Sequence, residues 1–387
     1  RYMKITFLLS HVPGPRFYKK MKKTKEHFFL SVVYRNRKSE TFQTFFYDEH
    51  IQRYEVIDGN FKAWKIPINL YFVFIKRSIN RLKRVDPDII HCANLDMLLI
   101  ARIYKMMYNK EVRIAYEIGD LNKRTYNNSK KIIKRLIKHF LVKTEGILTK
   151  SVDLLIISSQ YFWDVYYNKF ISKEKTFLFP NAPERELFKG ISSKTDGNTF
   201  TIGFIGRVRY SEQLKMLADV VDRINKSKVD VNIKFLIAGV GPESDTISEY
   251  VKDMNFVDFY GAYNYDEEIA DIYSSVDMVY SVYDAKYQNV KIAIPNRLYE
   301  AIVTEKPIIV AKETKLEDFV VNNGIGFAVD SHNPKDLLEL LTNIVEDKTM
   351  IKNAKKQCEL IKDKFFVDHY QEELITQYKS LLSNVDN

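Results

Sequence analysis

The sequence predicts an α/β protein of two Rossmann-like domains that face each other across a cleft, with a C-terminal helix that packs back on the N-terminal domain. Three observations support this class. The chain has 387 residues, more than twice the roughly 100–150 residues of a common domain. Short β-rich runs alternate with longer helical segments, which is typical of βαβ units and parallel sheets. The alternation stops at a polar stretch near the middle of the chain and then restarts.

The first alternation predicts an N-terminal domain over residues 1–184. It begins with an apolar strand, Met3–Ser10, which ends in a turn rich in proline and glycine, and a basic helix follows to about Lys25. The other predicted strands are 28–34, 88–92, 112–116, 153–158 and 176–179. The other predicted helices are 69–85, 96–108 and 129–150. The polar residues 185–198 are the predicted linker.

The second alternation predicts a C-terminal domain over residues 199–366. Its predicted strands are 201–205, 233–238, 257–260, 278–281, 307–310 and 326–329. Its predicted helices are 212–227, 244–254, 266–276 and 296–304. From about Lys335 the pattern is helical, and residues 367–387 hold the helix that is expected to return to the N-terminal domain.

Composition excludes several classes of protein. Hydrophobic residues make up 45% and charged residues 28% of the chain, which excludes disorder and low complexity as its main character. The apolar runs fall short of the roughly 18–20 residues that span a bilayer. Cys92 and Cys358 are the only cysteines, so no disulfide or metal framework is expected, and a reducing compartment is the simplest assumption.

The net charge of +10 is unevenly distributed. Residues 1–190 hold 37 Lys+Arg against 18 Asp+Glu, a net +19, whereas the rest of the chain holds 23 against 32, a net −9. This asymmetry indicates a polyanionic partner or an anionic membrane surface for the N-terminal half, with abundant lysine and no such partner as the alternative. Residues 129–150 predict an amphipathic helix that either packs on the sheet or lies on a membrane surface.

Two loops of the C-terminal domain carry residues suited to a phosphorylated ligand. In open parallel sheets ligands bind beyond the carboxyl ends of the strands. After the first strand, Gly206 lets the backbone approach a ligand, and Arg207 and Arg209 can clamp a diphosphate. After the next strand, Gly241 lies in a strand-to-helix turn, which alone is a weak signal.

A third loop starts a helix at Pro295. The free N–H groups of that first turn and the positive end of the helix dipole can hold phosphate. Glu300 lies one turn further on, where it can accept hydrogen bonds from ribose hydroxyls. These loops predict a nucleotide site in the C-terminal domain.

The motifs of both halves resemble the GT-B glycosyltransferases of family four, the glycosyl transferases group 1 type. In the C-terminal half the likeness rests on Gly-Phe-Ile-Gly-Arg at 203–207, Ile-Ala-Gly-Val-Gly-Pro at 237–242 and Pro-Asn-Arg-Leu-Tyr-Glu at 295–300. In the N-terminal half it rests on Pro-Arg at 15–16, Asp-Pro-Asp-Ile-Ile-His at 86–91, Asn-Leu-Asp at 94–96 and Tyr-Glu-Ile-Gly-Asp at 116–120. The likeness covers nearly the whole chain.

The resemblance implies roles for individual residues. Glu300 would match the glutamate on the nucleotide ribose, Arg209 would lie on the diphosphate as a catalytic cation, and Tyr263 would lie near the nucleobase. The full set of implied donor-binding residues is Gly14, Gly206, Arg207, Arg209, Gly241, Tyr263, Lys291, Pro295, Asn296, Arg297, Leu298 and Glu300. The acceptor-side candidates are His11, Arg16 and Asp96.

Three departures from the family pattern affect these expectations. Glu212 stands where the family has a lysine on the phosphate, and Lys291 and Lys215 are the candidate substitute cations. Ile292 stands where the family has a glutamate that touches the donor sugar. Gly119 stands where the family commonly has a histidine, which leaves Glu117 or Asp120 for a catalytic role near the acceptor.

The resulting hypothesis is a glycosyltransferase that uses a UDP- or GDP-sugar and a glycan or lipid-linked acceptor in bacterial surface polysaccharide synthesis. The resemblance implies retention of configuration, with no metal and no cofactor besides the sugar donor. We expect a cytoplasmic protein, peripheral on the inner face of the plasma membrane, and no nucleic-acid partner. The alternatives are a non-hydrolysing nucleotide-sugar epimerase and a non-catalytic, basic membrane- or nucleic-acid-binding protein.

Overall fold

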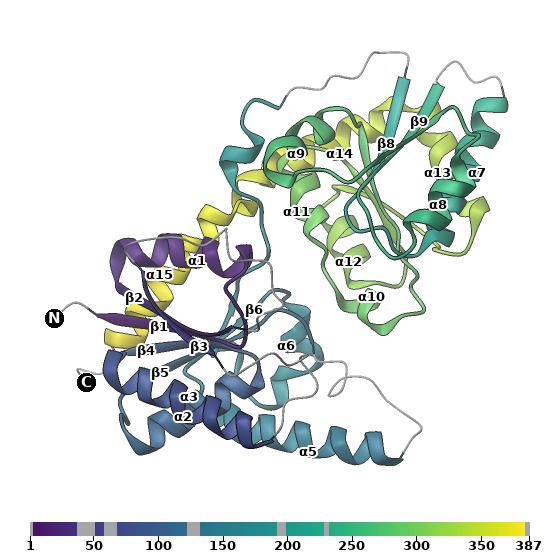
Figure 1. Ribbon diagram of the computed structural model, residues 1–387. Coiled ribbons are helices and arrows are strands. Elements are labelled where there is room, and N and C mark those ends of the chain that lie inside the picture. The colour runs from purple at the N-terminus through teal and green to yellow at the C-terminus, as the bar shows by residue number, and fades with distance from the viewer. Residues whose placement is uncertain are drawn as a thin grey trace. The chain divides into compact units, whose positions relative to one another are not determined.

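The computed structural model describes residues 3–36, 51–57, 68–121, 132–191, 199–227 and 232–383 (Figure 1). The chain divides into two compact units, Arg1–Pro180 with Tyr370–Asn387, and Asn181–His369. The second unit begins before the predicted linker 185–198. Arg185–Phe188 forms a 3-10 helix of that unit, because Phe188 packs in its core; residues 192–198 lie outside the described ranges.

A seven-stranded parallel sheet in the order β3-β2-β1-β4-β5-β6-β7 forms the centre of the first unit. Its strands are β1 (Lys4–Leu9), β2 (Phe29–Asn36), β3 (Gln52–Ile57), β4 (Ile89–Ala93), β5 (Arg113–Ile118), β6 (Leu154–Ile157) and β7 (Thr176–Leu178). The sequence did not predict β3. It is an edge strand, so its sequence lacks the continuous apolar run of a strand that is buried on both faces.

Helices cover both faces of this sheet. On one face lie α1 (Pro15–His27) and α15 (Val367–Ser383), and on the other lie α2 (Ile68–Val85), α3 (Leu95–Met107) and α5 (Ile132–Leu148) (Figure 1). The side-chain amide of Gln371 in α15 donates a hydrogen bond of 2.6 Å to the carbonyl of Lys19 in α1. The predicted return of the C-terminal helix to the N-terminal domain is therefore confirmed.

The second unit repeats the architecture with a six-stranded parallel sheet in the order β10-β9-β8-β11-β12-β13. Its strands are β8 (Thr199–Ile205), β9 (Asn232–Ala238), β10 (Val257–Gly261), β11 (Met278–Ser281), β12 (Ile308–Ala311) and β13 (Gly326–Val329). Its helices are α7 (Ser211–Lys226), α8 (Ser244–Val251), α9 (Tyr265–Ser274), α10 (Gln288–Ile292), α11 (Asn296–Val303), α12 (Lys315–Asn322), α13 (Pro334–Glu346) and α14 (Lys348–Ile361). The predicted α/β class with two Rossmann-like domains is confirmed.

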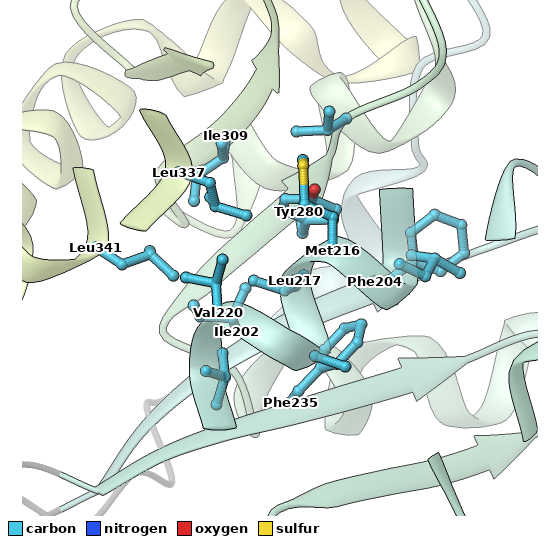
Figure 2. Close-up of a cluster of buried hydrophobic side chains, with 14 of the residues drawn as sticks. Ile202, Phe204, Met216, Leu217, Val220, Phe235, Tyr280, Ile309, Leu337 and Leu341 are labelled. Carbon is cyan, nitrogen blue, oxygen red and sulfur yellow. The ribbon is translucent and has the colours of Figure 1, made fainter. Parts of the chain in front are cut away.

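Close packing holds the helices of the second unit on its sheet. Figure 2 shows the cluster in which α7 and α13 cover one face. Its labelled residues are Ile202, Phe204, Phe235, Tyr280 and Ile309 from the strands, Met216, Leu217 and Val220 from α7, and Leu337 and Leu341 from α13. Interdigitated side chains of this kind fix each strand, and therefore each loop that follows it, in place. Among the described residues, no helix is both long and apolar enough to cross a membrane.

In each sheet the strand order reverses at one point, between β1 and β4 in the first unit and between β8 and β11 in the second. Ligands of doubly wound sheets bind at such switch points, beyond the carboxyl ends of the strands. The loops after β1, β4 and β5, and those after β8, β9 and β11, therefore form the candidate ligand-binding edges of the two sheets.

Candidate active site

The turns after β8 and β9 pack backbone against backbone. Gly206 and Gly239 have φ values of +128° and +130°. L residues that carry a side chain rarely adopt this backbone conformation. A Cβ at Gly239 would lie 1.9 Å from the Gly206 carbonyl oxygen, and one at Gly241 would lie 2.1 Å from the Val208 carbonyl oxygen. Packing thus explains these glycines, including the predicted ligand residue Gly241, whose N–H already donates to Ser244 Oγ at 2.7 Å.

Two arginines are exposed on the turn after β8. Val208 is fully buried between Arg207 and Arg209, so the alternating backbone directs both guanidinium groups to solvent. Neither arginine forms an ion pair with an acidic side chain in the described ranges of the chain. Guanidinium groups bind phosphate oxygens with two parallel hydrogen bonds, so this turn can hold a diphosphate as the sequence predicts.

Glu300, in α11, is the buried carboxylate of the second unit. Tyr265 donates a hydrogen bond of 2.7 Å to its Oε1, and Tyr273 donates one of 2.8 Å to its Oε2. Burial, followed by the negative charge of Glu300, raises the pKa of Tyr273 well above its usual range and that of Tyr263 to about 12, so both phenols stay protonated at neutral pH. Each carboxylate oxygen can accept more than one hydrogen bond, which leaves Glu300 capacity to bind ribose hydroxyls.

Arg297, one of the predicted donor-binding residues, lies beneath the first glycine turn. It is 5% exposed, and its Cζ lies 4.0 Å from the centre of the Phe204 ring. A Cβ on Gly206 would lie 2.7 Å from Arg297 Nη2, so the glycine makes room for this guanidinium. Arg297 Nη1 donates to the carbonyl of Tyr280 at 3.4 Å. These contacts give Arg297 a supporting position under the turn.

The start of α11 differs from the sequence-based prediction at one residue. Pro295 is the N-cap and Asn296 is exposed in the first turn, as a phosphate site at this helix end requires. Leu298 is fully buried in the hydrophobic core, and its N–H donates to the carbonyl of Pro295 at 3.1 Å. This geometry argues against Leu298 as a donor ligand. Lys291 Nζ lies 3.7 Å from a carboxylate oxygen of Glu313 in an exposed ion pair.

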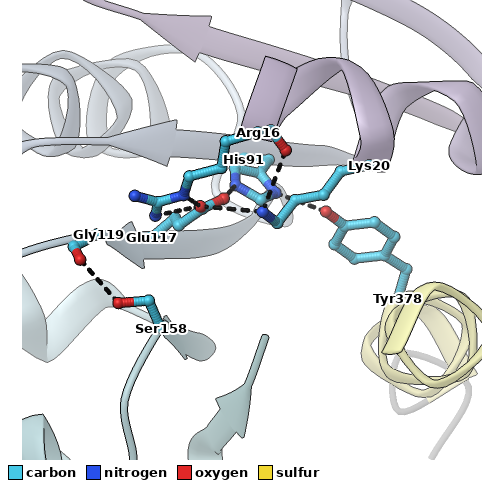
Figure 3. Close-up of polar contacts among 7 residues, drawn as sticks. All are labelled: Arg16, Lys20, His91, Glu117, Gly119, Ser158 and Tyr378. Carbon is cyan, nitrogen blue, oxygen red and sulfur yellow. Dashed lines mark hydrogen bonds and ion pairs between the residues drawn. The ribbon is translucent and has the colours of Figure 1, made fainter. Parts of the chain in front are cut away.

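Glu117, at the end of β5, is the centre of a polar cluster in the first unit (Figure 3). Arg16 donates to its Oε1 from Nε at 2.7 Å and also from Nη2, and Lys20 Nζ lies 3.2 Å from the same oxygen. His91 Nε2 lies 2.6 Å from Glu117 Oε2, and His91 Nδ1 lies 2.5 Å from the hydroxyl of Tyr378 in α15. The cluster therefore joins α1, β4 and β5 to the C-terminal helix α15.

The protonation states in this cluster follow from burial and charge. Burial alone would raise the pKa of Glu117, but Arg16 and Lys20, and then His91, hold it well below its usual range. Burial lowers the pKa of Lys20 to about 8, and it also lowers the pKa of His91, although Glu117 opposes both shifts. A neutral His91 then donates from Nε2 to the carboxylate and accepts from Tyr378 at Nδ1.

The catalytic prediction for Glu117 does not fit this environment. Its side chain is 1% exposed and receives hydrogen bonds on both oxygens, so it has neither access to substrate nor the raised pKa of a general base. Glu117 instead positions Arg16, whose side chain is 29% exposed. A Cβ at Gly119 would lie 1.6 Å from Arg16 Nη1, so the arginine fills the space of a side chain at position 119.

The other predicted residues of the first unit lie just beyond the strand ends. His11 packs edge-on against Phe17, with their ring centres 5.8 Å apart, and its Nδ1 lies 3.3 Å from Ser10 Oγ. Asp96 Oδ1 accepts from the Met97 N–H at 3.0 Å at the start of α3. Asp120, which directly follows Gly119, is exposed, so its carboxylate is accessible to a ligand.

Gly14 stands apart from the other loop glycines. It is the N-cap of α1 with φ −89°, a conformation open to any residue, and a Cβ there would have nothing within 4 Å. Neither packing nor backbone geometry within the described chain requires a glycine here. Open space at the N-terminus of a 13-residue helix suits the close approach of an anionic group, as the resemblance implies.

Sequence reasoning missed four residues that hold these sites. Lys20 lies among similar lysines of α1, and Tyr378 is 287 residues away from His91, so no local pattern marks either one. Tyr265 and Tyr273, which hold Glu300, occur eight residues apart on one face of α9. Their spacing was visible in the sequence, but tyrosine is common in this chain, which has 25 of them. Within the described residues, no three His, Cys, Asp or Glu side chains are grouped as metal ligands.

The fold is of the GT-B type, which has two α/β domains. The structure superposes on that of Anabaena Alr3699/HepE in complex with UDP with a TM-score of 0.73 and 16% identity, covering 98% of this chain and 100% of that one. It superposes on the apo form of the lipopolysaccharide outer core galactosyltransferase WaaB with a TM-score of 0.68 and 14% identity, covering 98% and 99%. At these identities the likeness establishes the fold.

Residues 188–359 match the family model described as glycosyl transferases group 1. This segment lies within the second unit and contains every donor-side residue predicted there. In a curated relative, the succinoglycan biosynthesis protein ExoL of Rhizobium meliloti (strain 1021), 25% of 304 aligned residues are identical, covering 76% of this chain and 72% of ExoL. The family match and the fold together support a relationship of this chain to the group 1 glycosyl transferases. Its assignment to family four stays a prediction.

Proposed function

We propose that the protein is a glycosyltransferase that transfers a sugar from a UDP- or GDP-sugar to a glycan or lipid-linked acceptor in surface polysaccharide synthesis. One observation carries the proposal: exposed Arg207 and Arg209 lie on a glycine turn at the switch point of the second sheet, with buried Glu300 on the neighbouring helix. The group 1 match over this segment, the relative named for succinoglycan biosynthesis and the UDP-bound structural neighbour support the same assignment.

The proposed reaction is a displacement at the anomeric carbon of the donor sugar. The acceptor hydroxyl oxygen forms the new bond to that carbon while the bond to the diphosphate oxygen breaks. In a retaining reaction the acceptor proton passes to the departing diphosphate oxygen, so no side chain has to act as the base. Arg207 and Arg209 would stabilise the negative charge that develops on the diphosphate, usually the largest contribution of a protein to such a step.

The first unit would supply the acceptor side. Gly14, at the open N-terminus of α1, and Arg16, held by Glu117, are the groups there that suit an anionic part of the acceptor or donor. Asp120 is the accessible carboxylate of that edge. We propose that the reaction needs no metal or further cofactor and takes place on the inner face of the plasma membrane, where the positive charge of the first unit would meet anionic lipid.

Two variants test the proposed donor site. Arg209→Ala and Glu300→Ala should each abolish sugar transfer while circular dichroism and melting temperature show that the fold survives. Arg223→Ala, an exposed arginine at the other end of α7, is the matched control and should transfer sugar like the wild type. Transfer at the wild-type rate by both donor-site variants would contradict the proposal.

The epimerase alternative predicts a different product. The protein should be incubated with a nucleotide sugar and no acceptor, and the sugar analysed by chromatography. An unchanged donor sugar supports transfer, since a transferase needs its acceptor. Conversion of the sugar alone would establish an epimerase.

A further inference from the structure

The first half of α5 exposes an apolar surface that nothing in the described chain covers. Its members, called the α5 stripe below, are Ile132, Ile133, Leu136, Ile137 and Phe140, which are 46–72% exposed. The sequence left open whether these side chains pack on the sheet, and in the structure they do not. Ile147 lies about two helical turns beyond Phe140 on the same helical face, and it is also 46% exposed.

The second half of α5 anchors the helix to the first unit. Glu145 is buried, and its carboxylate accepts hydrogen bonds from the hydroxyls of Tyr116 at 3.3 Å, Tyr166 at 2.7 Å and Tyr167 at 2.7 Å. Leu148 is buried beside it. The helix is thus fixed at one end by a polar cluster, while its apolar first half faces solvent. Exposed apolar surface on a firmly placed helix marks an interaction site.

The charge on α5 indicates the kind of partner. Its basic side chains are Lys134, Arg135, Lys138 and Lys143, and the one acidic residue of the helix is Glu145, which is covered by the three tyrosines. A second copy of this chain would bring the same positive charges together, which is unfavourable. An apolar face flanked by cations is complementary to an anionic lipid bilayer.

A basic pocket lies where the apolar face ends. Arg102 Nη1 donates to the carbonyl oxygen of Ile147, and Arg102 is one of the residues that line a cavity of about 460 Å³. The lining residues are Arg102, Lys105, Met106, Lys110, Lys150 and Ser151. Lys105 is paired with Asp153 at 3.1 Å, whereas Lys110 and Lys150 are exposed and form no ion pair with acidic residues of the described ranges.

We propose that the α5 stripe and the basic pocket dock the first unit on an anionic phospholipid bilayer. The stripe lies among the upper parts of the acyl chains, and Arg102, Lys110 and Lys150 bind a lipid phosphate beside Ile147. From Phe140 to Leu148 the helix advances about 12 Å at 1.5 Å per residue, so one helix spans both contacts. The inference deepens the proposed function, because it names the surface that would bring the enzyme to a lipid-linked acceptor.

The experiment is co-sedimentation of the full chain with vesicles of phosphatidylcholine, with and without phosphatidylglycerol. We expect binding to the anionic vesicles alone. Leu136→Ser with Phe140→Ser should lower the partition coefficient about tenfold or more, since two exposed side chains lose their burial in lipid. Val321→Ser with Leu360→Ser is the matched control, because both residues are exposed apolar side chains of the second unit.

The pocket needs its own variant. Lys110→Glu with Lys150→Glu should weaken binding about tenfold, and Lys22→Glu with Lys356→Glu, which changes net charge equally at exposed positions elsewhere, should weaken it much less. Inorganic phosphate added as a competitor distinguishes a free phosphate site from a lipid site. Strong competition at concentrations that leave ionic strength almost unchanged would overturn the lipid assignment.

A second readout separates this inference from the proposed function. Nucleoside diphosphates should stabilise the stripe and pocket variants against heat as much as the wild type. Equal vesicle binding by all variants would overturn the docking surface and leave the donor site standing. Normal vesicle binding without any nucleotide stabilisation would overturn the proposed function and leave the docking surface standing.

Discussion

Glu117 and Glu300 are both buried carboxylates at the ligand-binding edges of their sheets, but their neighbours differ. Glu117 is surrounded by the cations Arg16 and Lys20 and by His91. Glu300 is held by the neutral hydroxyls of Tyr265 and Tyr273. The first carboxylate balances charge within the protein. The second can still accept hydrogen bonds, and it lies on α11, whose Arg297 packs beneath the turn that carries the exposed arginines. Their surroundings thus indicate a positioning role for Glu117 and a binding role for Glu300.

The largest expected effect is on stability at Glu117. Glu117→Gln leaves Arg16 and Lys20 without their counter-charge, and breaking a buried ion pair in this way costs about 3–5 kcal/mol. The free energy of unfolding from urea titration should fall by that amount. Glu300→Gln loses no ion pair, so it should cost clearly less. Equal losses in the two variants would contradict the distinction between the two carboxylates.

The affinity for the donor nucleotide should depend more on Glu300 than on Glu117, the reverse of the order for stability. Glu300→Gln removes a charged acceptor for ribose hydroxyls, and a hydrogen bond to a charged group is worth about 1.5–3 kcal/mol. The Kd of the preferred nucleoside diphosphate should rise roughly 10- to 100-fold by calorimetry, with the melting temperature of the unliganded protein little changed. An unaltered Kd would remove Glu300 from the donor site.

Acid should reduce the stability that Glu117 contributes. Its folded-state pKa lies well below the ordinary value of 4.5, so its contribution is complete above that value and is lost as pH falls through the lower, folded-state pKa. The difference in unfolding free energy between wild type and Glu117→Gln should therefore stay constant from neutral pH down to about 4.5 and shrink as the pH is lowered further toward 3. A difference that stays constant over this range would mean that Glu117 is not ionised in the folded protein.

The smallest expected effect concerns the glycines beside Arg16. Gly119→Ala forces the flexible Arg16 guanidinium to move, since a Cβ would lie 1.6 Å from Nη1. Loss of that contact with Glu117 should cost about 1 kcal/mol, because Arg16 is partly exposed to solvent. Gly14→Ala is the control, with open space at its Cβ, and should change the melting temperature very little. A larger loss in Gly14→Ala than in Gly119→Ala would contradict the proposed contact.

The sequence predicted the repeated α/β pattern because each element carries its own signal. Apolar runs in β1, β4 and β8 and the periodicity of α7 depend on local burial, and their predicted positions lie close to the observed ones. The local signal fails at the sheet edge, where β3 pairs with one neighbouring strand, β2, instead of two. It also fails at Leu298, because a motif spacing does not tell which side of a short helix faces the core.

The site residues were predicted where chemistry is local and missed where it is not. Arg207, Arg209 and Glu300 were predicted because each lies in a recognisable strand-to-helix loop. The role of Glu117 depends on Arg16 and Lys20, about a hundred residues earlier in the chain, and on Tyr378, far beyond it. These contacts arise only when the strands of the first sheet align and α15 returns to it.

The measurement that tests the central claim most directly is a thermal-shift titration with UDP and GDP. A ligand that binds only the folded state raises its stability, by about 2.7 kcal/mol at a hundredfold excess over Kd. We expect one of the two nucleotides to raise the melting temperature of the wild type and of Arg223→Ala, and to raise that of Arg209→Ala far less. No shift with either nucleotide, or equal shifts in all three proteins, would contradict the donor site at Arg209 and Glu300.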